Sequence, residues 1–375
     1  MKVVSVVGAR PQFIKSAPMS RVLRRRHCQV LVHTGQHYDR ELSAVFFDEL
    51  DIPAPDYYLG VGSGPHGAQT GAMLQAIERV LISESPDWTL VYGDTNSTVA
   101  GALAAAKLHI PVAHVEAGLR SYNRRMPEEI NRVVTDHVSD LLLCPSDTAA
   151  RNLQAEGIAR GVHVVGDVMV EALASAAEAA RQRSEVLGSL RLSERAYLLV
   201  TVHRAENTDD PARLQSIVAA LKSLAEPVVW PVHPRTRKAL QALGCAPGQS
   251  PHLHLVEPLG YLDMVRLEES ARMILTDSGG IQKEAYWLGV PCLTLRDETE
   301  WVETVEAGWN RVVGVDPERI VDAVRSFSPP VRRPQLYGDG PTQVAERCVA
   351  LLEQTSPESR VAAMCPVAQP AGHLR

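Results

Sequence analysis

Short apolar runs rich in β-branched residues alternate with amphipathic stretches along most of the chain, and this alternation constrains the fold more than any other feature. In the first half the apolar runs span residues 3–7, 29–34, 89–93, 112–116, 141–145 and 163–166. Stretches with helical spacing separate them at 16–26, 68–83, 98–108, 128–139 and 148–156. Such uninterrupted apolar runs are typical of strands covered on both faces, as in a parallel sheet. The pattern predicts a doubly wound α/β unit.

The same alternation restarts near residue 197. Apolar runs lie at 197–202, 228–232, 253–256, 273–276 and 291–295, with helical stretches at 212–224, 236–243, 263–271, 281–288 and 318–326. Between the halves, residues 169–183 are Ala-rich and helical and residues 184–195 are polar, so we place the linker there. We expect an N-terminal domain at 1–168 and a C-terminal domain at 169–340 that face a cleft, and a loose tail at 355–375 that lacks periodicity.

Composition excludes several classes of protein. With 38 Lys and Arg against 44 Asp and Glu, the net charge is −6, which argues against a nucleic-acid binder. The sequence has no apolar stretch long enough to span a membrane and no signal-peptide pattern at its start. The six cysteines are scattered without a disulfide or zinc spacing, as expected of reduced thiols. We therefore expect a cytoplasmic enzyme that binds neither nucleic acid nor membranes.

Ligands of open α/β sheets bind beyond the carboxyl ends of the strands, so the residues that follow strands deserve inspection. The first strand is followed by a Gly8 turn, with Arg10 and Lys15 at the start of the next helix. A helix N-terminus flanked by cations is a natural anion site. The alternative is a structural turn with two surface cations. Neither a dinucleotide fingerprint nor a P-loop occurs in the sequence.

Three carboxylates follow strands or open a helix in the first half. Asp94 ends the 89–93 run, Glu116 ends the 112–116 run, and Glu128 stands beside Glu129 in a helical first turn. Each has a structural alternative: Asp94 or Thr95 as a helix cap, Glu116 in an ion pair with Arg120, and the two glutamates favoured by the helix dipole. Their convergence on one sheet edge favours general acid/base work, because crowded carboxylates separate one another's pKa values.

The second half places histidines and small residues after its strands. His203 and Arg204 follow one strand, and His233 repeats the arrangement one strand later. Such histidines can donate to a phosphate or a leaving group, or can serve as helix caps. A further strand runs into Ser278, Gly279 and Gly280, whose backbone amides could hold a diphosphate on a helix dipole unless they form a plain tight turn. Glu284, one turn later, could accept hydrogen bonds from a ribose diol.

The sequence contains no metal-binding pattern. Its thirteen histidines include no HExxH motif, and the close pairs His33/His37 and His252/His254 have no matching third ligand. We therefore expect no metal site.

Seven motifs occur in an order that identifies the family. They are GARPQFIK, HTGQHYD, VYGDTNST, HVEAGLRS, MPEEINR, VTVHRAEN and DSGGIQKEA. Together they resemble the non-hydrolysing UDP-N-acetylglucosamine 2-epimerase family over about residues 2–350. The resemblance implies the GT-B fold, with two Rossmann-like domains and a C-terminal helix at about 341–353 that crosses back onto the first domain. It also implies a homodimer, a UDP-sugar substrate, no redox cofactor or metal, and a role in polysaccharide biosynthesis.

The resemblance also implies a mechanism and residue roles. The family eliminates UDP across C1–C2 to give a 2-acetamidoglucal, then adds UDP back with a proton on the opposite face of C2. By motif matching, Asp94, Glu116 and Glu128 are the acid/base set, and Glu128 is preferred to Glu129 because it directly follows a proline. His203 matches the histidine at the diphosphate. The remaining matches are Arg10 and Lys15 as cleft cations, Ser278 and Gly280 as phosphate contacts, and Glu284 as the ribose contact.

The chain departs from the GlcNAc-specific members at three places. Where those members read TERPE, this chain has Thr299–Glu303 as TEWVE, so that Trp301 replaces an arginine. Ala205 replaces a basic or polar residue, and an arginine is missing from the His66–Gln69 region. These variants resemble a branch that acts on modified sugars such as UDP-2,3-diacetamido-2,3-dideoxyglucuronate. The alternatives to UDP-N-acetylglucosamine 2-epimerase are therefore that branch, a hydrolysing relative that releases free ManNAc, a glycosyltransferase and a non-catalytic binder.

Overall fold

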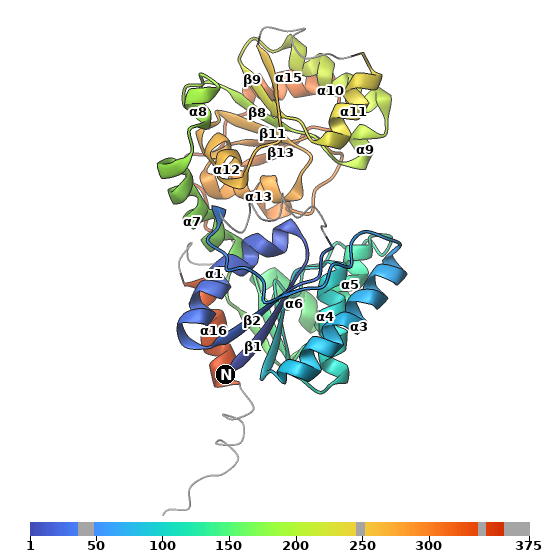
Figure 1. Ribbon diagram of the computed structural model, residues 1–375. Coiled ribbons are helices and arrows are strands. Elements are labelled where there is room, and N and C mark those ends of the chain that lie inside the picture. The colour runs from blue at the N-terminus through green and yellow to red at the C-terminus, as the bar shows by residue number, and fades with distance from the viewer. Residues whose placement is uncertain (37–48, 245–251, 337–342, 356–375) are drawn as a thin grey trace, which may run out of the picture. The chain divides into compact units, whose positions relative to one another are not determined.

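The computed structural model describes residues 1–36, 49–244, 252–336 and 343–355, and the chain divides into two compact units. The first unit comprises residues 1–172 together with 337–375, and the second comprises residues 173–336. Each unit has one parallel sheet with helices on both of its faces (Figure 1). The tail predicted at 355–375 lies outside the described residues except for Thr355.

The first unit contains a seven-stranded sheet in the order β3-β2-β1-β4-β5-β6-β7, with every neighbouring pair parallel. The strands are β1 (Lys2–Val7), β2 (Cys28–His33), β3 (Tyr57–Tyr58), β4 (Trp88–Tyr92), β5 (Val112–Val115), β6 (Leu141–Cys144) and β7 (Val162–Val164). Its helices are α1 (Arg10–Arg26), α3 (His66–Glu84), α4 (Asn96–Lys107), α5 (Pro127–Val138), α6 (Asp147–Ala155) and α16 (Val344–Gln354). Helices α1 and α16 lie on one face of this sheet and α3 and α4 on the other (Figure 1).

The second unit contains a six-stranded sheet in the order β10-β9-β8-β11-β12-β13, again parallel throughout. The strands are β8 (Leu198–Thr201), β9 (Val228–Pro231), β10 (Leu253–Val256), β11 (Met273–Thr276), β12 (Cys292–Thr294) and β13 (Asn310–Val312). Its helices are α8 (Val186–Ser189), α9 (Ala205–Thr208), α10 (Pro211–Ser223), α11 (Pro234–Ala242), α12 (Tyr261–Ser270), α13 (Gly279–Leu288), α14 (Val302–Glu306) and α15 (Pro317–Ser326). Helix α7 (Val168–Arg183) contains the boundary between the two units.

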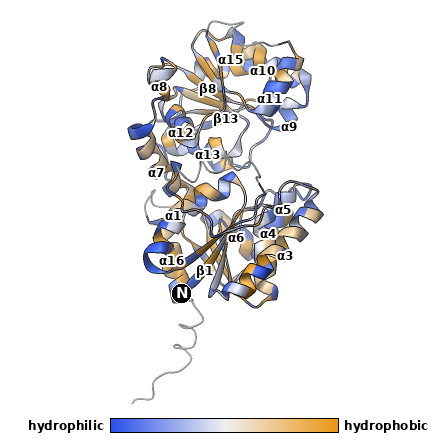
Figure 2. Ribbon diagram, viewed as in Figure 1, coloured by the Kyte–Doolittle hydropathy of each residue, from blue (hydrophilic) through white to orange (hydrophobic). Residues whose placement is uncertain are grey.

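Each face of the second sheet packs its own core. Leu198 and Val200 of β8 join a cluster with α10 and α15, whereas Leu199 joins a cluster with α12 and α13. Side chains that alternate along a strand point to opposite faces, so a strand that is apolar at every position needs helices on both sides. The apolar colouring accordingly runs along the central strands, while the polar residues lie on the outer faces of the helices (Figure 2).

The predicted strands and long helices are present, and the differences have simple causes. Helix α1 begins at Arg10, earlier than the predicted start at 16, because Pro11 and Gln12 already lie in its first turn. The short elements β3, β13, α8, α9 and α14 were not predicted, since two to five residues carry too little periodicity to stand out. The polar stretch 184–195 predicted as linker contains α8, and its Leu187, Leu190 and Leu192 pack against the core of the second unit.

Helix α16 packs against α1 within the first unit through charged ends. The basic last turn of α1 offers Arg25 and Arg26, which form ion pairs with Glu346 at 3.0 and 2.5 Å. His27 lies 2.8 Å from Glu353. Cations at the C-terminus of α1 also complement its dipole. The RVLRRR run is therefore the end of the first helix, as predicted.

Within the described ranges, no helix combines the length and apolarity that crossing a bilayer requires. Cys28 is exposed and Cys144, Cys292 and Cys348 are buried, all four as free thiols.

Candidate functional site

A buried glutamine joins the turns that follow the two central strands of the first sheet. The Gln12 side-chain oxygen accepts hydrogen bonds from the backbone amides of Gly8 and Ala9 at 2.8 and 3.1 Å. Its amide nitrogen donates to the Tyr92 carbonyl and to Thr98, both at 2.9 Å. Gln12 therefore fixes the β1–α1 turn against the β4–α4 turn. Its motif contains this residue, but the sequence gave no reason to assign it a role.

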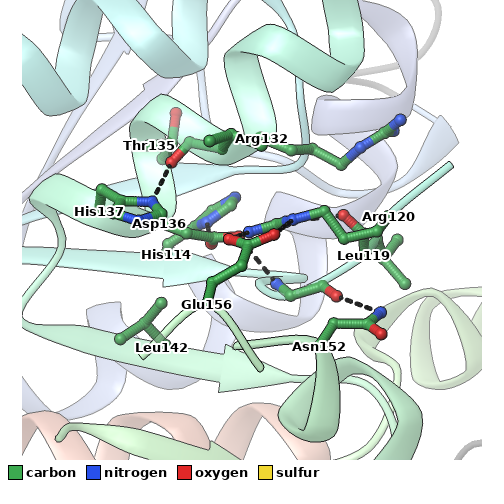
Figure 3. A network of polar contacts seen from close by, with 12 residues as sticks. His114, Leu119, Arg120, Arg132, Thr135, Asp136, His137, Leu142, Asn152 and Glu156 are labelled. Carbon is green, nitrogen blue, oxygen red and sulfur yellow. Dashed lines mark hydrogen bonds and ion pairs between the residues drawn. The ribbon is translucent and has the colours of Figure 1, made fainter. Parts of the chain in front are cut away.

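Lys15 and Glu116 form a buried ion pair at the carboxyl ends of β1 and β5. Both residues are less than one-tenth exposed. Glu116 has a φ of 69°, a left-handed conformation that is costly for a residue with a side chain and that is frequent at functional sites. The predicted alternative, an ion pair of Glu116 with Arg120, is wrong. Arg120 instead binds Asp136 and Glu156, each at 2.7 Å (Figure 3).

Asp94 follows β4 and binds the guanidinium group of Arg132 at 2.6 Å. It is not the helix cap, because Thr95 accepts the hydrogen bond from Thr98 at the start of α4. Burial raises the pKa of Asp94 most; Lys15 and Arg132 oppose this rise, while Glu116 and Glu128 add to it. The structure thus brings the three predicted carboxylates together at one sheet edge, with two cations among them. A carboxyl group whose pKa is raised can exchange a proton closer to neutral pH.

The two neighbouring glutamates of α5 have different surroundings. Glu129 is buried, binds Arg132 at 2.7 Å, and accepts hydrogen bonds from the backbone amides of Ser121 and Tyr122 at 2.9 Å. These contacts lower its pKa although burial alone would raise it. Glu128 is exposed. Glu129 thus holds the 121–122 loop and Arg132, which leaves Glu128 the more suitable of the two to meet a substrate.

In the second unit, one buried aspartate organises the residues that follow β8. Asp277 accepts hydrogen bonds from the backbone amides of His203 and Arg204 at 3.0 to 3.1 Å, and from the Asn207 side chain at 3.1 Å. Its carboxylate also lies 3.2 Å from Nδ1 of His203. Burial raises its pKa, but His203 and these hydrogen bonds lower it further, so Asp277 is ionised. It therefore holds the His203 ring with Nε2 available; the sequence analysis gave Asp277 no role.

Ser278 caps α13 with its side chain, and the two glycines follow it as the first residues of the helix. A methyl group at Gly279 would collide with Glu300, and Gly280 is exposed with open space beside it. The ring of His233 lies 6.0 Å from that of His203, and its side chain accepts the first backbone amide of α11 from Arg235. His233 is therefore a helix cap, the alternative noted for such histidines.

Glu284 lies within a buried acidic cluster. Tyr261 donates a hydrogen bond to it at 3.3 Å, and burial raises its pKa to about 7, with Tyr261 and Lys283 opposing the rise. Glu268 is fully buried nearby, and burial together with Glu284 raises its pKa well above the ordinary value. Two carboxyl groups that share a buried region cannot both ionise readily.

The positions where the motifs depart from the GlcNAc-specific pattern carry new contacts. The ammonium group of Lys283 lies 4.3 Å from the centre of the Trp301 ring, a cation–π geometry. Arg204, which precedes Ala205, lies 3.7 Å from Glu300. In the first unit, the His66 and Gln69 side chains contact Asn96 at 3.1 and 2.8 Å.

Comparisons with known proteins identify the family. The family model for UDP-N-acetylglucosamine 2-epimerase matches residues 21–353. The chain belongs to the UDP-N-acetylglucosamine 2-epimerase family.

Its relatives extend over nearly the whole chain. A UDP-N-acetylglucosamine 2-epimerase homolog of Methanococcus maripaludis is 54% identical over 88% of this chain and 93% of its own. The UDP-2,3-diacetamido-2,3-dideoxy-D-glucuronate 2-epimerase of Pseudomonas aeruginosa is 49% identical over 91% of this chain and 96% of its own. The Methanocaldococcus jannaschii UDP-GlcNAc 2-epimerase, solved with UDP-GlcNAc and UDP, aligns with a TM-score of 0.85 at 43% identity over 94% and 99% of the two chains.

These comparisons and the two sheets confirm the predicted fold class, two parallel-sheet α/β domains of GT-B type. In the described parts of this epimerase-family chain, no three His, Cys, Asp or Glu side chains gather as a metal would require. Sequence reasoning gave no role to Gln12, Arg132, Asp136 and Asp277, although all but Asp136 lie inside quoted motifs.

Gly93 and Gly157 test how far the epimerase-family site depends on its turn. Both have a positive φ, 61° and 82°, but a methyl group at Gly93 would press on Lys15 and Glu116, whereas none of its surroundings crowds Gly157. We expect Gly157→Ala to lower stability by about 1 kcal/mol through backbone strain alone. Gly93→Ala should cost at least about 3 kcal/mol, because it also disturbs a buried ion pair. Urea unfolding of both variants measures this, and equal losses would contradict it.

The Glu284 cluster predicts a dependence of stability on pH. A pKa raised from 4.5 to about 7 means that the folded state prefers the protonated carboxyl. The stabilisation is therefore complete below about pH 4.5 and is lost as pH rises to about 7. Between pH 5 and pH 8, the wild-type unfolding free energy should fall by about 2–3 kcal/mol more than that of Glu284→Gln. Urea unfolding at the two values checks this, with Glu318→Gln at an exposed position as control; parallel behaviour of all three proteins would refute it.

Proposed function

We propose that the protein is a non-hydrolysing UDP-N-acetylglucosamine 2-epimerase that interconverts UDP-GlcNAc and UDP-ManNAc. The observation that carries the proposal is the gathering of Asp94, Glu116 and Glu128 around Lys15 and Arg132 in the first unit. Inverting C2 requires one group to take a proton from one face and another group to return a proton to the other face. A single carboxylate cannot reach both faces, whereas a group of carboxylates with different surroundings can.

The reaction proposed is an elimination followed by its reverse on the opposite face. A base takes the C2 proton, the C1–C2 double bond forms, and UDP leaves C1 with the electron pair of the glycosidic bond. UDP then adds back to C1 as C2 gains a proton on its other face. The sequence is redox-neutral, so it needs no oxidising or reducing cofactor.

Departure of UDP requires groups that stabilise a diphosphate, and the second unit supplies them. We propose His203, Arg204, Ser278, Gly279 and Gly280 for this role. His203 is oriented by Asp277, and the exposed turn at Gly280 opens α13 with unpaired backbone amides and the positive end of its dipole. Positioned donors of this kind stabilise charge that develops in the transition state. Glu284 is proposed as the ribose contact, Arg10 as a further cation for the substrate, and His233 as a neighbour of His203.

A second candidate function has specific observations in its favour. The Pseudomonas aeruginosa relative at 49% identity is a UDP-2,3-diacetamido-2,3-dideoxy-D-glucuronate 2-epimerase, and this chain has Trp301 where the GlcNAc-specific pattern has arginine. The contact of Trp301 with Lys283 places a cation beside the loop that departs from that pattern. We propose the modified-sugar substrate as the alternative, because an additional cation suits a sugar that carries a carboxylate.

We further propose that the protein works in the cytoplasm as a homodimer in polysaccharide biosynthesis. These proposals rest on the resemblance to the family. Light scattering of the purified chain tests the dimer directly.

Deuterium exchange distinguishes the proposed reaction from its alternatives. Incubation with UDP-GlcNAc in D2O should place deuterium at C2 while UDP stays attached. Accumulation of free ManNAc and UDP would instead identify a hydrolysing enzyme, and sugar transfer to an acceptor without C2 exchange would identify a glycosyltransferase. NMR follows all three outcomes, and a parallel assay with the diacetamido-uronate sugar tells which substrate is preferred.

The carboxylates and the histidine should separate by their effect on turnover and binding. Asp94→Asn, Glu116→Gln and Glu128→Gln should each lower kcat by at least about 100-fold, as expected for lost acid/base groups, while UDP affinity stays nearly unchanged. His203→Ala should weaken UDP binding as well as turnover. Calorimetry with UDP and the exchange assay give the two quantities. Wild-type turnover in any one amide variant would remove that residue from the acid/base set.

Trp301 should influence the choice of sugar. Replacing it by arginine restores the residue of the GlcNAc-specific pattern and places a second cation against Lys283. We expect Trp301→Arg to shift the ratio of kcat/KM values towards UDP-GlcNAc by about tenfold, the equivalent of about 1.4 kcal/mol. Trp301→Phe, which keeps an aromatic ring under the ammonium group, is the matched control. An unchanged ratio in the arginine variant would exclude a role in specificity.

A further inference from the structure

His114 lies in β5, fully buried, with a hydrogen-bond acceptor at each ring nitrogen. Nε2 is 2.7 Å from the Gly93 carbonyl oxygen, and Nδ1 is 2.7 Å from Oδ1 of Asp136. A carbonyl oxygen can only accept a hydrogen bond, so Nε2 must carry a proton. The protonation of Nδ1 then depends on the charge of Asp136.

Asp136 is held as a carboxylate by the groups on its other oxygen. Oδ2 accepts hydrogen bonds from Arg120 at 2.7 Å and from the Gly118 amide at 3.2 Å (Figure 3). Burial would raise the pKa of Asp136, but His114 and Arg120 together hold it below the ordinary value. An ionised carboxylate also only accepts, so Nδ1 of His114 carries a proton as well.

We propose that His114 is a buried imidazolium that positions the Gly93–Asp94 turn for the epimerisation chemistry, a role that rests on the proposed function. His114 touches neither Asp94 nor Glu116 in the contacts described, so it is a positioning residue. It acts through the carbonyl of Gly93, to which it donates a charge-assisted hydrogen bond.

Gly93 is the point at which the proposed acid/base groups meet. Asp94 directly follows it, and a methyl group at its Cα would lie 3.1 Å from the Lys15 ammonium and 3.3 Å from the Glu116 carboxylate. Its amide also donates to the Val115 carbonyl at 3.0 Å, which joins the ends of β4 and β5. A rotation of the Gly93 peptide would therefore move Asp94 and disturb the Lys15–Glu116 pair together.

The imidazolium is supported by a chain of alternating charges. Behind His114 stand Asp136, Arg120 and Glu156, the last two joined by two hydrogen bonds of 2.7 Å (Figure 3). The two cations and two anions cancel, so a buried charge on His114 is compensated. Asp136 belongs to α5, the helix that also carries Glu128 and Arg132. The same chain thus ties the Gly93 turn to the helix that bears the third carboxylate.

The charge state can be measured without reference to activity. In the full-length protein labelled with ¹⁵N-histidine, NMR at pH 7.5 should show both His114 nitrogens protonated, with the signals assigned by their loss in His114→Gln. One unprotonated ring nitrogen would overturn the proposal, whatever the protein catalyses. If the chain failed to epimerise any UDP-sugar, only the proposed function would fall, because the NMR result does not depend on it.

Two isosteric variants separate positioning from simple structural support. The amide nitrogen of glutamine can occupy the place of Nε2 and keep the bond to Gly93, whereas that of asparagine replaces Nδ1 and keeps only the bond to Asp136. We expect kcat of His114→Asn to fall about 100-fold below that of His114→Gln, the scale of a misplacement near 1 Å. UDP affinity should stay within about twofold of wild type in both. Equal kcat losses, or a loss that appears in UDP affinity instead, would show that His114 does not position the turn.

Discussion

The buried ion pair between Lys15 and Glu116 is the interaction on which the first unit's site depends. Moving two charges out of water is costly, and such a pair is tolerated only when its geometry is fixed by other contacts. Here the surrounding chain supplies that geometry at a price in backbone strain: Glu116 takes a positive φ, and Gly93 gives up its side chain so that the pair can lie against it. Strain of this kind persists where the surrounding structure overdetermines it.

The two units handle charge in opposite ways. The first gathers carboxylates and balances them with Lys15 and Arg132, so that Asp94 holds its proton more tightly than an ordinary aspartate. The second buries one ionised aspartate, Asp277, beneath His203 and presents the N-terminus of α13 beside it. Carboxylates suit proton transfer, and amides and cations suit a diphosphate. A net charge of −6 describes neither arrangement, because both depend on local grouping.

Much of the fold could be read from the sequence because it follows from local patterns. Apolar runs gave the strands, helical spacing gave the helices, and the carboxyl ends of parallel strands gave the edges where Asp94, Glu116 and His203 lie. The pairing of those residues could not be read in the same way. Glu116 was expected opposite Arg120, its neighbour in sequence, but binds Lys15, which is 101 positions away. Gln12, Asp136 and Asp277 likewise act through partners on other strands.

The sequence by itself determined the class of fold, the family and the identity of the chemically active residues, because these depend on periodicity and on residue types in fixed motifs. Tertiary structure decided which of two adjacent glutamates is committed to Arg132, which histidine caps a helix and which is held by an aspartate, and how His114 is bonded at both nitrogens. These outcomes depend on the directions in which side chains leave neighbouring strands. That geometry exists only once the sheet has formed and its edges have brought distant residues within hydrogen-bonding distance.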